Sequence, residues 1–88
     1  MRTSEMFQQE IAKVPIDLRL ELDLSFAIAD KIDAILQRKG MTQKEFAKRM
    51  NKTESEVSRW LSGTHNFTLK TLAKITFVLD ENIVVISE

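Results

Sequence analysis

Two helix-capping sequences, eleven residues apart, constrain this chain more than any other feature. They are TQKE at residues 42–45 and TESE at residues 53–56. In each capping box the threonine hydroxyl accepts a hydrogen bond from the third helical amide. The glutamate carboxylate accepts one from the threonine amide, so each box starts a helix. The first predicted helix, of about two turns, would bury three residues: Phe46, Ala47 and Met50.

Only Asn51 and Lys52 separate the two predicted helices. Two residues allow nothing but a tight turn, and asparagine tolerates the left-handed backbone that such a turn requires. The second helix ends before Gly63 and would bury Val57, Trp60 and Leu61. Two short helices joined by a tight turn predict a helix-turn-helix motif over residues 42–62, whose second helix can enter the major groove of DNA.

The remaining segments are also predicted to be mainly helical, because the chain contains two glycines and one proline. Apolar spacing predicts a short helix over 4–13, ended by Pro15, and a longer one over 25–39. A further helix starts at Thr68, which would cap it, and Asn82 would break it. Its buried side would be formed by Leu69, Leu72, Ala73, Ile75, Thr76 and Leu79.

Two other segments allow more than one interpretation. Residues 16–24 alternate apolar and charged residues, which is typical of a strand, but Leu18 and Leu22 also lie at helical spacing. The β-branched run IVVI at 83–86 predicts a short C-terminal strand. It would pair with the same strand of a second subunit or with residues 16–22. Alternatively, it is a frayed apolar tail packed on the helices.

A chain of 88 residues has room for one modest core. We therefore expect a single all-α domain in three parts. Residues 1–24 would form an N-terminal extension and residues 25–80 the helix-turn-helix domain. Residues 81–88 would form the short strand, which is also the predicted dimer contact.

The net charge of zero hides a segregation of charge along the chain. Residues 38–74 contain nine Lys or Arg against three Glu. Residues 1–37 contain seven Asp or Glu against four Lys or Arg, and residues 75–88 contain three acidic residues and no basic one. A basic centre of this kind is typical of a phosphate-binding face, although a solvated helical surface would look the same.

Composition argues against catalysis. The chain has no cysteine and one histidine, so a thiolate zinc site and a cysteine nucleophile are excluded, and two isolated glycines cannot form a phosphate loop. We expect no enzyme activity, no cofactor and no metal. No apolar run is long enough to cross a bilayer and no apolar signal region is present, which predicts a small cytoplasmic protein without a membrane association.

Residues 40–80 resemble the Xre-type helix-turn-helix family, the lambda-repressor/Cro-like DNA-binding fold. The resemblance is carried by Thr42, Gln43, Ala47, Val57, Ser58, Trp60, Gly63 and Leu72. Segments 24–30 and 63–67 are similar to a small bacterial subgroup that includes HigA-type antitoxins. The resemblance implies a compact five-helix domain, with 16–24 extending the first core helix. It also implies a homodimeric repressor on a palindromic operator and, for the subgroup, a cognate toxin as a second partner.

The sequence departs from the family pattern at the turn and on the recognition helix. Asn51 stands where glycine is usual, and Glu54 and Glu56 stand where polar or basic residues are commoner. Glu54 either accepts a hydrogen bond from cytosine N4 or favours the helix N-terminus. For Glu56, closure of the capping box is the better interpretation.

The candidate DNA contacts lie on and beside the second helix of the motif. Arg59 can bind guanine bidentately or clamp a phosphate. By resemblance, Gln43 binds a phosphate and braces the recognition helix, while His65 would contact the DNA backbone from a loop. Trp60 is predicted to be core rather than surface. The predicted contacts are Gln43, Lys44, Lys52, Thr53, Glu54, Ser55, Ser58, Arg59, Thr64, His65 and Asn66.

One alternative function remains at this level: a protein-interaction module that uses the helix-turn-helix only as a scaffold. Salt dependence would separate the two. DNA affinity falls steeply with salt because phosphates are neutralised, whereas an apolar interface barely responds.

Overall fold

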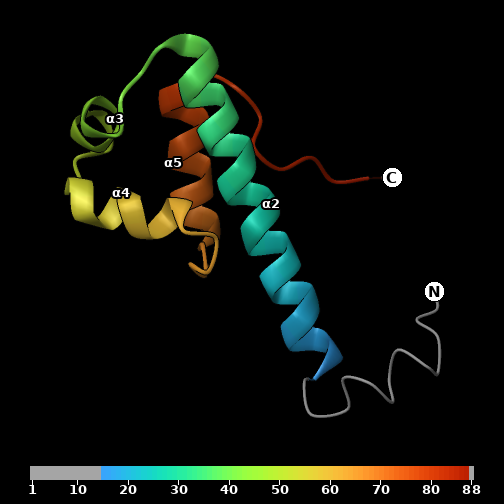
Figure 1. Ribbon diagram of the computed structural model, residues 1–88. Coiled ribbons are helices and arrows are strands. Elements are labelled where there is room, and N and C mark those ends of the chain that lie inside the picture. The colour runs from blue at the N-terminus through green and yellow to red at the C-terminus, as the bar shows by residue number, and fades with distance from the viewer. Residues whose placement is uncertain (1–14, 88) are drawn as a thin grey trace.

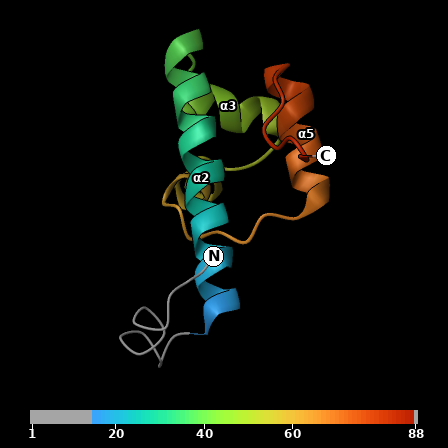
Figure 2. The ribbon, with the colours of Figure 1, turned by 90° about the vertical axis from the view of Figure 1, so that its right-hand side faces the viewer.

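The computed structural model describes residues 15–87, most of which lie in four helices (Figure 1). These are α2 (Ile16–Lys39), α3 (Gln43–Met50), α4 (Glu54–Leu61) and α5 (Leu69–Leu79). The views in Figures 1 and 2 show that α3 and α4 lie on one side of α2, and that the C-terminal tail lies on the other. The helix predicted over 4–13 lies outside the described residues, so the five-helix count is not reproduced in the part that is described.

Residues 16–24 are helical and continuous with 25–39, so the helical interpretation is confirmed and the strand is wrong. The backbone N–H of Arg19 donates to the Pro15 carbonyl at 3.1 Å, which closes the first turn. The other end of α2 is set by Gly40, whose left-handed backbone (φ 68°) follows the cations of the last turn. None of the described helices combines the length and the apolar character needed to cross a membrane.

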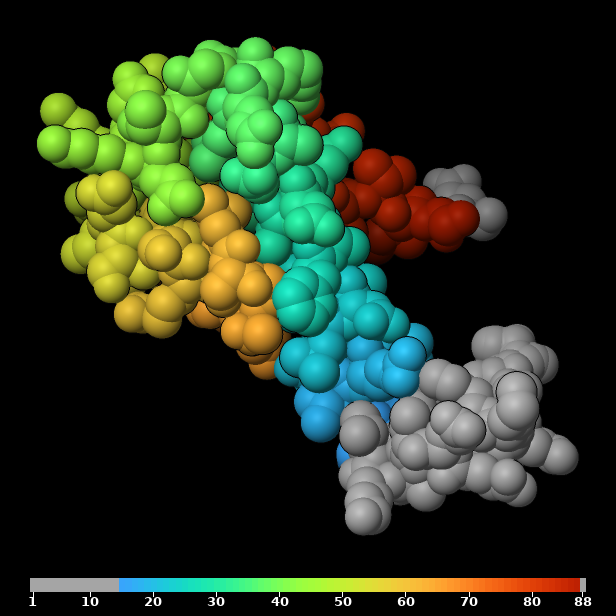
Figure 3. Space-filling view, in the orientation of Figure 1, coloured from blue at the N-terminus to red at the C-terminus, as the bar shows by residue number. Residues whose placement is uncertain are grey.

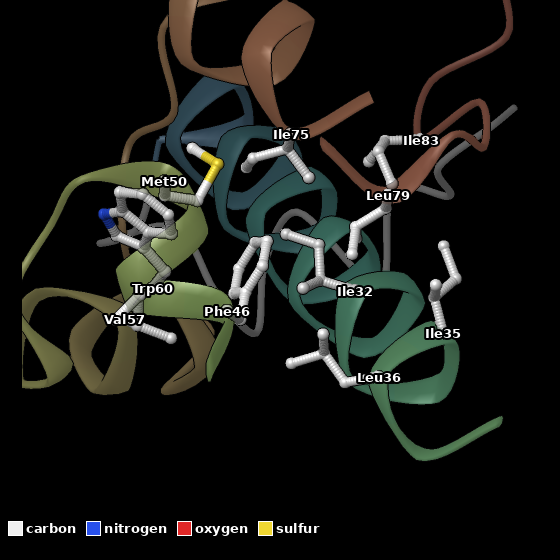
Figure 4. Packing of buried hydrophobic residues seen from close by; sticks show 11 residues of the cluster. Ile32, Ile35, Leu36, Phe46, Met50, Val57, Trp60, Ile75, Leu79 and Ile83 are labelled. Carbon is white, nitrogen blue, oxygen red and sulfur yellow. The ribbon is translucent and has the colours of Figure 1, made fainter. Parts of the chain in front are cut away.

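The core lies where α2, α3, α4 and α5 converge (Figure 4). α2 contributes Ile32 and Leu36, Phe46 of α3 lies beside Ile32, and Trp60 of α4 packs on the other side of Phe46. Trp60 is only 4% exposed, which confirms its prediction as a core residue. The cluster also contains Ile35, Ala47, Met50, Val57, Ile75, Leu79 and Ile83.

The prediction for α5 is partly wrong. Thr68 caps the helix as expected, since its hydroxyl accepts the backbone N–H of Thr71 at 3.1 Å. However, Leu69 is 84% exposed and lies with Phe77 on the outward side of the helix. Leu69 and Phe77 are eight residues apart and therefore lie on the same side of the helix. The core faces the other side, which contains Ile75. The helix ends at Leu79, before Asn82.

The predicted C-terminal strand is wrong: residues 81–87 form no strand. Residues 16–22, one of its two proposed partners, belong to α2 and cannot pair with it. The tail is instead held on the helices by the buried side chain of Ile83 and by an ion pair, which is the third interpretation of this segment. In that pair Arg38 Nη1 donates to Glu81 Oε2 at 2.7 Å and Arg38 Nη2 donates to Glu81 Oε1 at 2.6 Å.

Candidate nucleic-acid interface

Both predicted capping boxes are formed in full. The backbone N–H of Glu45 donates to Thr42 Oγ1 at 3.0 Å, and the backbone N–H of Thr42 donates to Glu45 Oε1 at 2.9 Å. At the start of α4 the same two bonds join Thr53 and Glu56, at 3.1 and 2.9 Å. Each box satisfies two backbone donors that a helix N-terminus otherwise leaves open. The starts of both helices are therefore fixed locally.

The capping bonds also lower the pKa values of the two glutamates. The backbone N–H of Thr42, and then its hydroxyl, hold the pKa of Glu45 below its ordinary value. The backbone N–H of Thr53, followed by its hydroxyl, lowers the pKa of Glu56 in the same way. Both carboxylates are charged at neutral pH, and each points back to the N-terminus of its own helix. The capping interpretation of Glu56 is therefore the one that its contacts support.

The turn between α3 and α4 depends on two residues with special requirements. Asn51 adopts a left-handed backbone (φ 60°), as the turn demands, and its N–H donates to the Lys48 carbonyl at 3.1 Å. Ala47 is buried, so the two helices can approach closely there. Asparagine therefore adopts the conformation required where the family usually has glycine.

Four aromatic rings pack together around Trp60 on the buried side of α4. The rings of Phe46 and Trp60 meet edge to face, with centroids 6.2 Å apart. Trp60 also approaches Phe67 at 6.1 Å and His65 at 6.0 Å, and the His65 and Phe67 rings meet edge to face at 4.8 Å. The predicted DNA residue His65 is thus half-buried and packs its ring against this cluster.

Gly63, after α4, lies against the long helix. Its φ of +96° is a conformation that residues with a Cβ rarely adopt, and a Cβ there would overlap the ring of Phe26. Phe26 belongs to α2, so the loop after α4 is held closely to the middle of that helix. This contact holds the C-terminal end of α4 close to α2.

The predicted residues of α4 form one exposed surface. Glu54, Ser55, Ser58 and Arg59 are all exposed, and their spacing of three and four residues places them on neighbouring turns of one face. Thr64 and Asn66 are also exposed, in the loop beyond the C-terminal end of α4 (Figure 1). α4 is about 12 Å long, which separates these two loop residues from the turn at its other end.

A basic hollow lies between α3 and α4, next to that surface. It has a volume of about 550 Å³ and brings together three predicted residues, Lys44, Lys52 and Glu54. Lys48, which the sequence also offers as a plausible phosphate contact, lines it as well. Its position one turn after Lys44 is the sequence signal that identifies it. Gln43 is exposed at the first turn of α3 and does not line the hollow.

Two polar side chains in or near the candidate interface already form hydrogen bonds within the protein. The Thr53 hydroxyl serves the capping box. Lys74, on α5, donates from Nζ to the Met50 carbonyl at 2.7 Å and so satisfies an open acceptor at the C-terminus of α3. Nothing in the local sequence around Lys74 indicates this bond, because its partner lies 24 residues away.

The family model described as Helix-turn-helix matches residues 32–85, more than half of the chain. The chain belongs to this helix-turn-helix family. The match confirms the resemblance to Xre and lambda-repressor-like proteins, but it does not identify the HigA-type subgroup. No curated protein and no solved structure gave a significant match.

This membership gives the general function of the chain. The family consists of DNA-binding regulatory domains and is not a family of enzymes. The protein is therefore a DNA-binding regulator with α4 in the position of the recognition helix. The matched region excludes residues 16–31, the first two thirds of α2.

Proposed function

We propose that the protein represses transcription by binding a palindromic operator as a homodimer. The observation that carries this proposal is the exposed face of α4, held by a capping box and a tight turn and bordered by lysines, in a helix-turn-helix family. A single recognition helix reads only a few base pairs, so two copies on two half-sites supply the specificity.

Each side chain of the interface has a role that follows from its chemistry. Arg59 would read guanine O6 and N7, with Ser55 and Ser58 beside it making shorter contacts to base edges or phosphates. Lys44 and Lys52 would contact phosphates on the side of the hollow. Gln43, Thr53, Thr64, His65 and Asn66 complete the proposed contacts at its edges.

Glu54 has a different proposed role from Glu56. Glu56 is turned back to Thr53 by the capping box. Glu54 is exposed and lines the basic hollow, so its carboxylate is placed to accept a hydrogen bond from cytosine N4. An arginine that reads guanine and a glutamate that reads cytosine would favour G·C pairs within each half-site.

The test begins with selection of the preferred duplex from a random library, followed by affinity measurements on variants. Arg59→Ala should weaken binding to the selected duplex by about 1–3 kcal/mol and relax the preference at one base pair. Lys52→Ala should weaken all sequences about equally. Lys31→Ala, an exposed lysine on α2, is the matched control and should leave affinity unchanged. Wild-type affinity in Arg59→Ala would remove that residue from the reading surface.

The homodimer needs a self-complementary apolar contact, and α5 offers one. Leu69 and Phe77 lie two turns apart on its outward side, and both are more than four-fifths exposed. In analytical ultracentrifugation, Leu69→Gln with Phe77→Gln should convert a dimer into a monomer. A dimer that persists in this double variant would move the contact to another surface.

An antitoxin role is a further proposal, based on the similarity of segments 24–30 and 63–67 to HigA-type proteins. It would give the protein a second partner, a toxin. The gene neighbourhood tests it: an adjacent short reading frame for an RNase-like protein would support the role, and its absence in every genome that encodes this chain would oppose it.

A further inference from the structure

We propose that the first half of α2 and the groove beside it bind a second protein, through an amphipathic helix whose apolar stripe is flanked by basic residues. The α2 part of this surface lies outside the region matched by the family and on the side of α2 away from α3 and α4 (Figure 2). The proposal does not depend on which residues read DNA.

The first observation is an apolar stripe on α2 that the described residues of the chain leave exposed. Ile16, Leu20, Leu24 and Ala27 recur every three or four residues along one side of α2 over about three turns. All four are exposed, and Leu24 is 64% exposed. Figure 3 shows why: this half of the helix projects beyond the body of the molecule.

The second observation is that the stripe runs into a groove. The groove has a volume of about 550 Å³ and lies between α2, α5 and the C-terminal tail. Leu24 and Ala27 of the stripe line it, together with Ile28, Leu72, Val84 and Val85. Val84 and Val85 are exposed and line the opposite side of the groove. They belong to the C-terminal tail, which Figure 2 shows in front of α5. Stripe and groove therefore make one continuous apolar track, of the kind that receives a helix.

The third observation is the charge along the edges of this track. On the helical wheel, Asp17 and Glu21 flank the stripe on one side, while Asp23 and Asp30 flank it on the other. Lys31, at the groove end, lies in line with the stripe, and Arg19 lies beside Asp23 and Asp30, as far from the stripe as Glu21 is on the other side. Each side thus has two carboxylates against at most one cation, and the rim is net acidic on both sides.

An acidic rim decides between the possible occupants. Flanking charges on paired helices select their partners, and like charges facing each other are unfavourable. If α2 paired with α2 of a second copy in antiparallel orientation, each flank would face the same flank of the other copy. In a parallel pair, each flank would face the opposite flank of the other copy. Both arrangements bring two net acidic rims together, and DNA or an anionic membrane would be repelled as well, so a partner helix with basic flanks is the occupant that fits best.

The location allows this partner and DNA to bind together. The candidate DNA surface belongs to α3 and α4, and the apolar track belongs to the opposite side of α2 (Figures 1 and 2). Occupation of the track would leave Arg59 and the basic hollow uncovered. The domain would then join DNA to a second protein.

The test uses a fluorescein-labelled synthetic helix as the probe, with leucines at helical spacing and lysines at the flanking positions. A second peptide carries glutamates at the same flanking positions. In fluorescence anisotropy with the full chain, the lysine peptide should bind at least about tenfold more tightly than the glutamate peptide. Equal binding of the two peptides would overturn the proposal.

Variants locate the binding and separate shape from charge. Leu20→Gln with Leu24→Gln should weaken the lysine peptide by at least about tenfold. Asp17→Lys with Glu21→Lys and Asp23→Lys should reverse the preference, so that the glutamate peptide binds better. Leu18→Gln, a matched loss of an exposed leucine on the other side of α2, should bind the lysine peptide as the wild type does. Unchanged emission of Trp60 would show that each variant is folded.

Two results would assign the surface to a different occupant and overturn the proposal. If Leu20→Gln with Leu24→Gln turned a dimer into a monomer, the track would be a contact between two copies. If Phe7→Gln with Ile11→Gln raised the affinity for the lysine peptide by more than about tenfold, the chain's own N-terminal residues would be the occupant. Neither result would bear on DNA binding, which the Arg59 variant tests separately.

Discussion

The α3–α4 pair and the first half of α2 are both helical, but different interactions hold them in that state. α3 and α4 each have eight residues, a capping box and a buried apolar face. The first half of α2 starts at a proline without a side-chain cap, and most of its apolar residues are exposed. Short helices need caps and tertiary packing, whereas residues 16–24 are helical because they continue a helix that the core holds further on.

The same comparison explains which predictions succeeded. The capping boxes, the two-residue turn and the burial of Val57 and Trp60 were predictable because each depends on residues within one or two turns. The alternation at 16–24 indicated two structures, and long-range continuity with Ile32 and Leu36 decided between them. The strand over 83–86 was wrong because β propensity depends on a pairing partner that the sequence could not identify.

The candidate site was predictable to a similar degree and for similar reasons. Exposure of Ser55, Ser58 and Arg59 follows from helical spacing once the start of α4 is known. The bond from Lys74 to Met50 joins residues 24 apart, so local patterns contain no sign of it. The packing of His65 on Trp60 depends on the path of the irregular loop after α4, which has no periodic pattern. Membership of the family supports DNA binding but does not test any single contact residue.

The largest loss of stability should come from a substitution on the buried side of α4. Trp60→Ala leaves a cavity among Phe46, His65 and Phe67 and should lower the free energy of unfolding by about 3–5 kcal/mol. Leu24→Ala, in the exposed half of α2, should change it by less than about 1 kcal/mol. Urea denaturation followed by circular dichroism measures both. Equal losses would mean that the first half of α2 is as strongly packed as the helix-turn-helix.

A smaller effect is expected where the two regions touch. Gly63→Ala should lower the free energy of unfolding by about 1–3 kcal/mol, since the backbone there has a positive φ and the new Cβ would meet Phe26. Adding Phe26→Ala removes the steric part of this loss and leaves the backbone part, so the two changes should not be additive. Strict additivity in the double-mutant cycle would show that the ring is not the obstacle.

Next in size is the cap of α4. Thr53→Ala removes the hydroxyl that accepts the Glu56 N–H and should cost about 1 kcal/mol of unfolding free energy. Thr64→Ala is the control, because that exposed threonine caps no helix. If both substitutions had the same small effect in urea denaturation, the start of α4 would be held by packing alone.

The capping glutamates also predict a dependence on pH. Their pKa values are lower in the folded protein than in the unfolded chain, so the stability they contribute is complete at neutral pH. It should begin to fall as the pH drops below the ordinary glutamate value of about 4.5 and be lost once the pH passes the lowered values. Glu45→Gln with Glu56→Gln should be less stable at pH 7 and show a flatter profile of urea midpoint against pH. A profile as steep as that of the wild type would assign the acid sensitivity to other carboxylates.

The smallest effect on global stability is expected at the exposed start of α2. Glu21→Gly should fray residues 16–24, because glycine costs about 1 kcal/mol within a helix, while the unfolding midpoint reported by Trp60 stays the same. Amide hydrogen exchange at 16–24 should become faster, and exchange at Ile32 and Leu36 should not. A lowered midpoint would show that the two halves of α2 unfold as one unit.

The ion pair between Arg38 and Glu81 has a consequence for the order in which the chain folds. It joins residues 43 apart, whereas α3 and α4 are neighbours along the chain. Contacts between distant residues require a large loop to close, so we expect α3 and α4 to associate early and the tail to dock last. An interaction absent from the transition state slows unfolding without accelerating folding. Arg38→Gln should therefore raise the unfolding rate in stopped-flow experiments and leave the refolding rate unchanged. The exposed ion pair would then prolong the lifetime of the folded protein without affecting how fast it forms.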